Sequence, residues 1–490
     1  MNPLVWCLRA DVAAELRSLR RYSVFIFQRM KFRNRTSRYY FHRSVLSLLI
    51  AAMIYAPPGM TAFTSNVIGV VNDETVDGSQ RVDERGTTNN AHIINHGNQE
   101  VYGGISNGSV IDTGGHQEVS GHGSYQGQAN NTVINGGSQT ISEGGISTGT
   151  IINDKGTMSV LTNAKADATR IDNGGVMDVA GNATNTIING GTQNINNHGI
   201  ATGTNINSGT QNIKSGGKAD TTNISSGSKQ VVEKGGTATG SNIRAGGTLI
   251  VDTGGIAHGV YLDTGSALVA NTGAGTDIDG YQRSSHFTIT GGRAEHVVLE
   301  NTGQLTVVAQ TSAVDTIVDA GGKLIVQKEA KTDTTRLNNG GVLEVQDGGE
   351  AKHVEQQSGG ALIASTTSGT HIEGTNSYGD AFYIRNSEAK NVVLENAGSL
   401  TVVTGSRAVD TIINANGKMD VYGKDVGTVL NSAGTQTIYA SATSDKANIK
   451  GGKQTVYGLA TEANIESGEQ IVDGGSTDKT HINGGTQTVQ

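Results

Sequence analysis

Hydrophobic and polar residues along most of this chain repeat with a period of 18 or 19 residues. Two units are visible in residues 185–214, NTIINGGTQNINNHGIATGTNINSGTQNIK. Each unit predicts two short strands, because the apolar residue comes two positions after a polar one, first as T-x-I/V and then as Q-x-I/V. Glycine-containing turns separate the strands, since glycine adopts the positive φ of a sharp corner. A small residue such as Ala219 follows the second turn.

A single unit of this kind cannot form a core, because each strand buries one face only and the unit is short. Stacked units bury that face against one another, with successive coils about 4.8 Å apart. The repeat therefore predicts an all-β chain folded as a right-handed parallel β-helix (β-solenoid), with one repeat per coil. Roughly 22 coils at this spacing would form a rod on the order of 100 Å long.

One position of the repeat predicts how the interior is organised. It lies two residues before the buried apolar residue of the second strand, so its side chain points inward. Its residues change in blocks rather than at random. In chain order they are Gln99, Gln117, Gln139, Met158, Met177, Gln193, Gln211, Gln230, Leu249, Leu268, Leu305, Leu324, Leu343, Leu362, Leu400, Met419, Gln436, Gln454, Gln470 and Gln487.

Hydrogen bonding explains why like residues stack on like. A buried amide needs partners, and an amide in the next coil supplies them in a ladder. A glutamine beside a leucine would leave donors and acceptors unsatisfied, at a cost of about 1–3 kcal/mol. Recent duplication of neighbouring repeats is the alternative explanation of the blocks. The structural amide ladder is predicted at Gln193, Gln211, Gln230, Gln436, Gln454, Gln470 and Gln487.

Two longer units interrupt the period in the same way, near residues 267–308 and 361–403. Both begin with an Ala-Leu pair and end in a VVLEN phrase followed by LTVV. We interpret each unit as a coil with a protruding hairpin or loop, near Tyr281 in the first and Tyr378 in the second.

Residues 1–62 have a different character and predict an export signal. A basic stretch at 33–43 precedes an apolar run at 44–56, which is too short for a comfortable membrane span. We expect cleavage after Ala62, so that the β-helical passenger occupies 63–490. An uncleaved N-terminal anchor is the alternative, and the signal region is either extended or truly starts at Met30.

Composition narrows the class of protein. The chain has 490 residues with 70 Gly, 3 Pro and 4% aromatics, too few large apolar groups for a conventional globular core. Residues 63–490 hold 26 basic and 42 acidic residues, a net charge of −16, so nucleic-acid binding is not expected. The only cysteine, Cys7, precedes the signal. Disulfides and thiolate metal sites are therefore not expected in the passenger.

A search for catalytic chemistry predicts no catalytic, cofactor-binding or metal-binding residue. Polysaccharide-active β-helix enzymes need clustered carboxylates on one face. His92 and His96 are four apart, which on a strand is one face, but no acidic ligand pairs clearly with them. Acidic residues fall mostly in turns or at outward strand positions, for example Glu100, Glu118, Asp178 and Glu344.

Three tyrosines form the one surface feature that stands out. Tyr422, Tyr439 and Tyr457 each follow the buried apolar residue of the second strand, so they are expected to stack outward on three successive coils. Exposed aromatic rings can bind sugar rings or another rod, which makes these residues a candidate surface contact. The plainer interpretation is a cross-strand ladder that only stabilises the sheet.

The phrases INGGTQ, SGGKADTTNI and VVLENAGSLTVV resemble the passenger domains of AIDA-type autotransporter adhesins, the group that includes antigen 43. The resemblance covers nearly everything after the signal. It implies a right-handed β-helix displayed on the outer surface of a Gram-negative bacterium. It also implies cell–cell aggregation, biofilm formation and attachment to a host-cell receptor or glycan. Some family members carry O-linked sugars on repeat serines and threonines.

The family pattern ends in a translocator barrel, and this sequence stops at Gln490 without one. Association with the outer membrane is therefore expected only through a barrel missing from this chain. The favoured hypothesis is a non-catalytic surface adhesin that associates with identical passengers. A polysaccharide-active enzyme and a truncated passenger without function are the alternatives.

Overall fold

The computed structural model describes residues 63–490, which form one compact unit. The predicted signal region, with Met30 and the cleavage point after Ala62, lies outside the described residues. From β1 (Asn66–Val67) to β60 (Thr486–Val489) this unit consists of strands and turns, without a helix. Accordingly, residues 63–490 include no helix long and apolar enough to cross a membrane.

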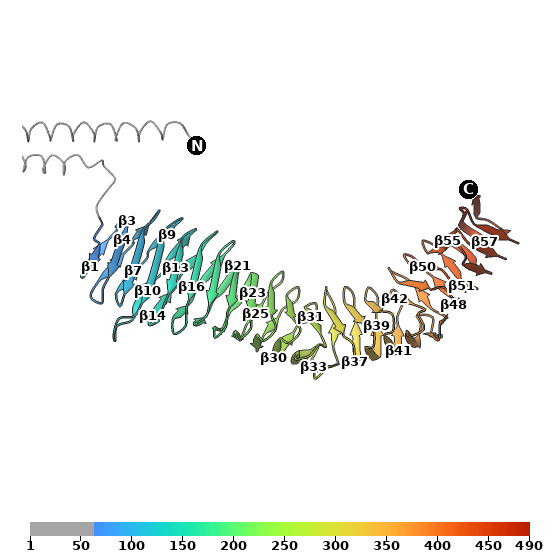
Figure 1. Cartoon of the computed structure of the whole chain (residues 1–490), viewed down its shortest axis with the longest axis horizontal. Coiled ribbons are helices and arrows are strands. Elements are labelled where there is room, and N and C mark those ends of the chain that lie inside the picture. Colours follow the sequence, from blue (N-terminus) through green and yellow to red (C-terminus); the bar gives the residue numbers. More distant parts are fainter. Residues whose placement is uncertain (1–62) are drawn as a thin grey trace, which may run out of the picture. The chain divides into compact units, whose positions relative to one another are not determined.

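The strands form a parallel β-solenoid of about 22 turns, which confirms the predicted fold class. A representative coil contains β24 (Lys218–Asp220), β25 (Asn223–Ile224) and β26 (Lys229–Val232). Each of these strands pairs in parallel with the equivalent strand of the next coil. Figure 1 shows the coils stacked in sequence order.

This representative coil has three strands, one more than the two that the sequence pattern predicts. The additional strand surrounds the small residue of the repeat, so Ala219 is buried at the centre of β24. Lys218 and Asp220 flank it and are exposed. Because only one of the three side chains points inward, and that one is alanine, this strand has no apolar alternation by which the sequence could reveal it.

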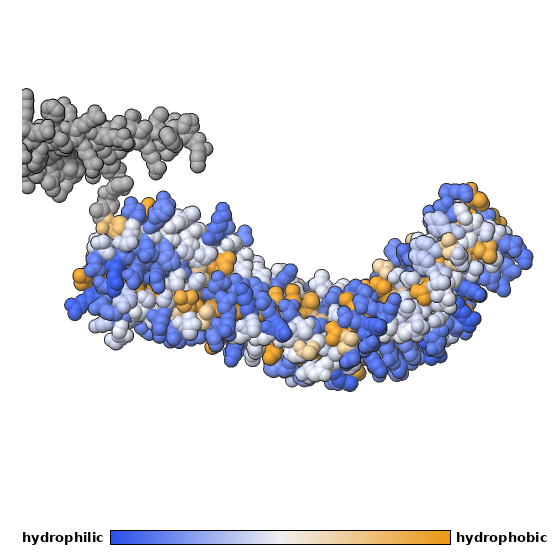
Figure 2. All heavy atoms as spheres, in the orientation of Figure 1, coloured by the Kyte–Doolittle hydropathy of each residue, from blue (hydrophilic) through white to orange (hydrophobic). Residues whose placement is uncertain are grey.

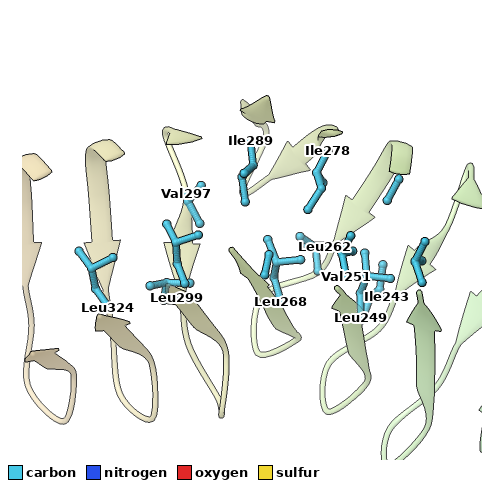
Figure 3. Close-up of a cluster of buried hydrophobic side chains, with 14 of the residues drawn as sticks. Ile243, Leu249, Val251, Leu262, Leu268, Ile278, Ile289, Val297, Leu299 and Leu324 are labelled. Carbon is cyan, nitrogen blue, oxygen red and sulfur yellow. The ribbon is translucent and has the colours of Figure 1, made fainter. Parts of the chain in front are cut away.

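Inward side chains form columns along the helix axis, because parallel strands bring the same repeat position of adjacent coils side by side. Ile224, for example, lies opposite Ile243 in the next coil, and both are buried. Figure 3 shows the aliphatic part of this core, in which Leu249, Leu268 and Leu324 are gathered in the interior. Burial of these columns is the main favourable contribution to stacking.

The two irregular units insert extra strands into one face of the solenoid. In the first, β32 pairs in parallel with β30, and β33 then pairs antiparallel with both β32 and β34. On another face, β31 pairs directly with β36. Two strands are therefore added on one face and none on the other. The bounds are β30 (Ile256–Leu262), β31 (Ala267–Asn271), β32 (Asp277–Gln282), β33 (Ser285–Thr290), β34 (Arg293–Glu295) and β36 (Gln304–Val307).

The second irregular unit repeats this arrangement. Antiparallel β44 lies between β43 and β45, while β42 pairs directly with β47. The predicted hairpins thus exist, but they are built into the sheet and do not protrude, because in-sheet pairing satisfies backbone groups on both sides of the inserted strand. The bounds are β42 (Ala361–Ser365), β43 (His371–Thr375), β44 (Ala381–Arg385), β45 (Glu388–Lys390) and β47 (Ser399–Val402).

The insertions also shift the register of the inward column. Leu305 lies opposite Ala270. The column predicted from the repeat had Leu268 as its neighbour, so the prediction is wrong at this point. The second irregular unit shows the same shift of two residues. Simple counting from repeat to repeat fails at these two points because the inserted strands change the path by which the chain returns to this face.

A glycine faces a phenylalanine at the same place in both insertions. Gly280 on β32 lies opposite Phe287 on β33, and Gly374 on β43 lies opposite Phe382 on β44. Both phenylalanine side chains are buried. The glycines are required by the close approach of the neighbouring coil, because a Cβ atom would collide with the carbonyl oxygen of Val260 at Gly280 and of Val354 at Gly374.

Candidate functional site

Glutamine side chains of the inward column form hydrogen-bonded ladders inside the solenoid. Nε2 of Gln454 donates to Oε1 of Gln436 at 2.7 Å, and Nε2 of Gln470 donates to Oε1 of Gln454 at 2.6 Å. Gln487 continues the series by donating to Gln470 at 2.7 Å. The first three are fully buried. In every bond, the side-chain amide of one coil donates to the side-chain carbonyl oxygen of the preceding coil, so all bonds of the ladder have the same direction.

The other glutamine blocks are built in the same way. Gln211 donates to Gln193 at 2.9 Å, and Gln230 donates to Gln211 at 2.7 Å. A third ladder lies near the start of the described residues. It also includes Gln80, which was absent from the column positions predicted from the repeat. Its bonds join Gln99 to Gln80 at 2.8 Å, Gln117 to Gln99 at 2.7 Å and Gln139 to Gln117 at 2.7 Å.

This common direction means that each block needs an acceptor before its first amide and a donor after its last carbonyl. At the start of the middle block, Gln193 donates to Thr186 Oγ1 at 3.1 Å and lies 3.7 Å from the sulfur of Met177. At its end, Ser241 donates to Oε1 of Gln230 at 2.7 Å. Methionine, a weak acceptor, therefore marks the change from aliphatic to amide stacking.

Threonines at the corner that begins the T-x-I/V strand are partners that the sequence reasoning missed. In the amide block, the buried hydroxyl of Thr204 donates to Gln193 at 3.3 Å, and that of Thr222 donates to Gln211 at 3.2 Å. Where the column is leucine or methionine, some corner threonines have a buried hydroxyl without a partner, namely Thr169, Thr316 and Thr411. The sequence does contain a signal for this pairing of corner and column residues. The corner residue is valine only in coils whose inward column residue is leucine, namely at Val260, Val297, Val354 and Val392.

Asp425 is a buried ionisable group at the start of the last amide block. It lies in β51 (Lys424–Val426) at the position that the preceding coil fills with Ala408. Its carboxyl group accepts hydrogen bonds from Gln436 Nε2 at 2.7 Å, Ser444 Oγ at 2.8 Å and Thr428 Oγ1 at 2.5 Å. Burial raises the pKa of Asp425 despite these bonds. Asp425 supplies the strong acceptor that the first amide of the block requires.

The raised pKa of Asp425 predicts a specific pH dependence of stability. Between the unfolded pKa, about 3.9, and the higher folded value, the native state binds more protons than the unfolded state. The free energy of unfolding should therefore fall as pH rises through this window. We expect the Asp425→Asn variant to lack this fall, so that chemical denaturation shows the native protein losing stability relative to the variant from pH 4 to pH 8.

Asp167→Asn is the matched control for this pH experiment. Hydrogen bonds from Thr184 and Asn185 lower the pKa of this half-buried carboxylate. Removing it should give a difference of the opposite sign, or none after screening by solvent. Equal pH profiles for the native protein and the Asp425→Asn variant would contradict the assigned role of burial.

The three predicted surface tyrosines form a continuous stack. The ring centroids of Tyr422 and Tyr439 are 4.2 Å apart with an angle of 9° between planes, and Tyr457 follows at 6.2 Å. Tyr422 and Tyr457 each keep 41% of their surface exposed. Hydrogen bonding with Tyr422, together with burial, raises the pKa of Tyr439 to about 12. Tyr439 is therefore neutral at physiological pH.

The outward carboxylates singled out in the sequence are neutralised or hydrogen-bonded by neighbouring coils. They do not converge on one point; each meets a side chain of an adjacent coil. The contacts are Glu100 with Arg81 at 3.7 Å, Glu118 with Ser142 at 2.9 Å, Asp178 with Asn194 at 2.9 Å and Glu344 with Lys323 at 2.6 Å.

A groove of about 740 Å³ beside β44 is lined by three acidic residues, the residue type that glycoside hydrolysis requires. Each acid is paired with a basic side chain. The pairs are Asp315 with His296 at 2.6 Å, Glu355 with Arg336 at 3.4 Å and Glu373 with His371 at 3.2 Å. The bond with His371 lowers the pKa of Glu373. A glycosidase acid needs the opposite shift, so Glu373 is poorly suited to act as a general acid.

His92 and His96 do not lie on one strand face, because the strand there is only two residues long, β6 (His92–Ile93). His96 lies in the following turn with a φ of 67°. His92 instead pairs with Asp112, with 2.6 Å between Nε2 and Oδ2. Across residues 63–490, no three histidine, cysteine, aspartate or glutamate side chains come together as metal ligands do.

Comparison with known proteins agrees with the interpretation of the repeat. A family model described as adhesin of bacterial autotransporter system, probable stalk, matches residues 122–175, 279–341 and 373–434. The probable autotransporter YpjA of Escherichia coli (strain K12) is 59% identical in an alignment that covers 93% of this chain, and the chain spans 44% of that protein.

Among solved structures, the TibC-catalysed hyper-glycosylated TibA55-350 fragment is 24% identical, covering 72% of this chain and 96% of the fragment, with a TM-score of 0.33. The stalk matches and the YpjA relative carry the assignment. Through its stalk repeats, this chain belongs to the AIDA-type autotransporter passengers.

Proposed function

We propose that residues 63–490 act as a non-catalytic adhesin passenger on the surface of a Gram-negative cell, where they associate with identical passengers and attach to host cells. The relation to autotransporter stalks supports export and display. The observation that carries the proposal is the ordering of outward polar side chains in columns. One column joins Asn72, Asn89, Asn107 and Asn130 by side-chain hydrogen bonds of 2.8, 3.0 and 2.9 Å.

Such a column is well suited to weak repeated contact. Each asparagine amide has two donors and an acceptor oxygen with two lone pairs, and the ladder uses only part of this capacity. The ladder also restricts the side chains before any partner arrives, so association costs less conformational entropy. Figure 2 shows that one face of the molecule is mostly hydrophilic, with apolar residues scattered over it. Many weak contacts between two such surfaces sum to a substantial affinity.

The net charge of residues 63–490 allows the proposed self-association to be tested by its dependence on salt. Two rods that each carry −16 repel one another, and salt screens this repulsion, with a Debye length of about 8 Å at physiological ionic strength. Beads coated with the purified protein should therefore settle faster as salt rises from about 20 to 150 mM. Cells that display the complete protein should clump and adhere to host cells. Dispersed beads together with non-adherent cells would contradict the proposal.

A further inference from the structure

A notch lies at the first residue of the tyrosine column. Two residues, Tyr422–Gly423, connect β50 (Lys418–Val421) to β51, whereas four residues form the equivalent turns of the coils before and after, at Val403–Ser406 and Tyr439–Ala442. The short turn is therefore recessed between two longer ones. The resulting notch has a volume of about 560 Å³ and is bounded on its far side by the Asn386–Ser387 turn.

The floor of the notch offers an aromatic surface. Tyr439 covers one side of the Tyr422 ring at 4.2 Å, but the preceding coil has Val403 at this position, so Tyr422 has an aromatic neighbour on one side only. Tyr422 lines the notch together with hydroxyl-bearing Thr404 and Ser441. The face of an aromatic ring is electronegative and attracts the partly positive C–H groups on the apolar face of a sugar.

The charges of the notch select for an anion. Glu388 forms an ion pair with Arg407 and also accepts a hydrogen bond from Tyr383. The bond with Tyr383 lowers the pKa of Glu388, so this carboxylate stays charged and neutralises Arg407. Lys424 is exposed, lines the notch and forms no ion pair with any residue of 63–490. The notch therefore carries one uncompensated positive charge on a strongly acidic rod.

We propose that this notch binds an acidic saccharide, with a sugar ring against Tyr422, the sugar carboxylate at Lys424 and sugar hydroxyls at Thr404 and Ser441. A saccharide fits better than a second copy of the chain, because the flanking four-residue turns keep a broad strand face away from the recessed floor, while a single ring can enter. The volume lies within the range of small-molecule sites. Binding of this kind is independent of self-association, although its biological use rests on the proposed surface display.

Calorimetric titration of the purified protein with a galacturonic acid trimer tests the proposal, with the methyl-esterified trimer as an uncharged counterpart. We expect the acid to bind and the ester to bind at least about tenfold more weakly, since a hydrogen bond to a charged group is lost. Lys424→Gln and Tyr422→Ala should each weaken binding of the acid by about tenfold or more. Lys328→Gln and Tyr457→Ala, which change a distant lysine and the far end of the tyrosine column, should leave it unchanged.

Absence of binding, equal affinity for acid and ester, or equal losses in the control variants would overturn the proposal. Circular dichroism and the thermal midpoint of each variant exclude misfolding as the cause of a loss. The bead-settling measurement on the same variants separates the two proposals. If Lys424→Gln and Tyr422→Ala abolish settling while no saccharide binds, the notch is a contact between copies, and the saccharide proposal is wrong while the adhesin proposal stands.

Discussion

Replacing Gln454 by leucine should lower the free energy of unfolding by about 2–6 kcal/mol. The change leaves two buried groups without partners, the carbonyl oxygen of Gln436 and the amide of Gln470, each of which has its hydrogen bond to Gln454. Each unsatisfied group costs about 1–3 kcal/mol. Leucine fills a similar volume, so the loss reports on hydrogen bonding more than on packing.

The loss of stability should be measured separately for the coils around Gln454, because solenoids unfold by groups of coils rather than strictly as a whole. Hydrogen exchange of backbone amides in β53 (Thr435–Ile438), β55 (Asn448–Val456) and β57 (Asn464–Val472) gives the local loss, and guanidinium denaturation gives the global one. Gln304→Leu is the control, since this glutamine is only partly buried and bonds weakly within its own strand, to Thr306 at 3.4 Å. If Gln454→Leu loses no more than this control, the ladder does not stabilise the core.

Replacing Gly374 by alanine is expected to displace the inserted strands of the second irregular unit, at a cost of about 1–3 kcal/mol or more. A Cβ atom at this position would lie 2.0 Å from the carbonyl oxygen of Val354, a backbone atom that cannot move aside freely. The strand would have to shift, and the Phe382 ring on the opposing strand would lose its packing. Hydrogen exchange in β43 and β44 should rise much more than in distant coils.

Gly69→Ala provides the comparison for this variant, because a Cβ atom there meets nothing within 4 Å. Its thermal midpoint should match that of the native protein. Gly280→Ala should repeat the effect of Gly374→Ala in the first irregular unit, where the clash with the Val260 carbonyl oxygen is 2.1 Å. Unchanged exchange in the inserted strands of both variants would show that the close backbone approach is not required.

Periodicity allowed the fold class and the inward column to be predicted, because each coil repeats the same burial problem at the same position. The ladder partners Gln436, Gln454 and Gln470 follow from that register alone. The third strand was missed because one alanine per strand gives no alternation. The place of the inserted strands within the sheet was missed because a hairpin that joins the sheet and one that leaves it have the same turn residues.

The chemistry of single residues was harder to predict. Asp425 has the sequence appearance of a surface charge, between Lys424 and Val426, and only the three-dimensional register shows that it occupies an alanine position beside Gln436. The recess at Tyr422 depends on the difference between the lengths of three successive turns, which becomes meaningful only once the strand ends are known. The tyrosine stack itself follows directly from the repeat.

The inserted strands have a consequence for how two copies could align. Each insertion lengthens one face of the solenoid by two strand spacings, about 10 Å, while another face gains nothing, so the axis must change direction there. Two copies of a uniform repetitive rod could associate in any register that differs by a whole number of coils. Because β32 and β43 set two such corners, neighbouring molecules follow the same contour only when their corners are level. In the proposed self-association, these corners would therefore restrict two copies to one preferred alignment.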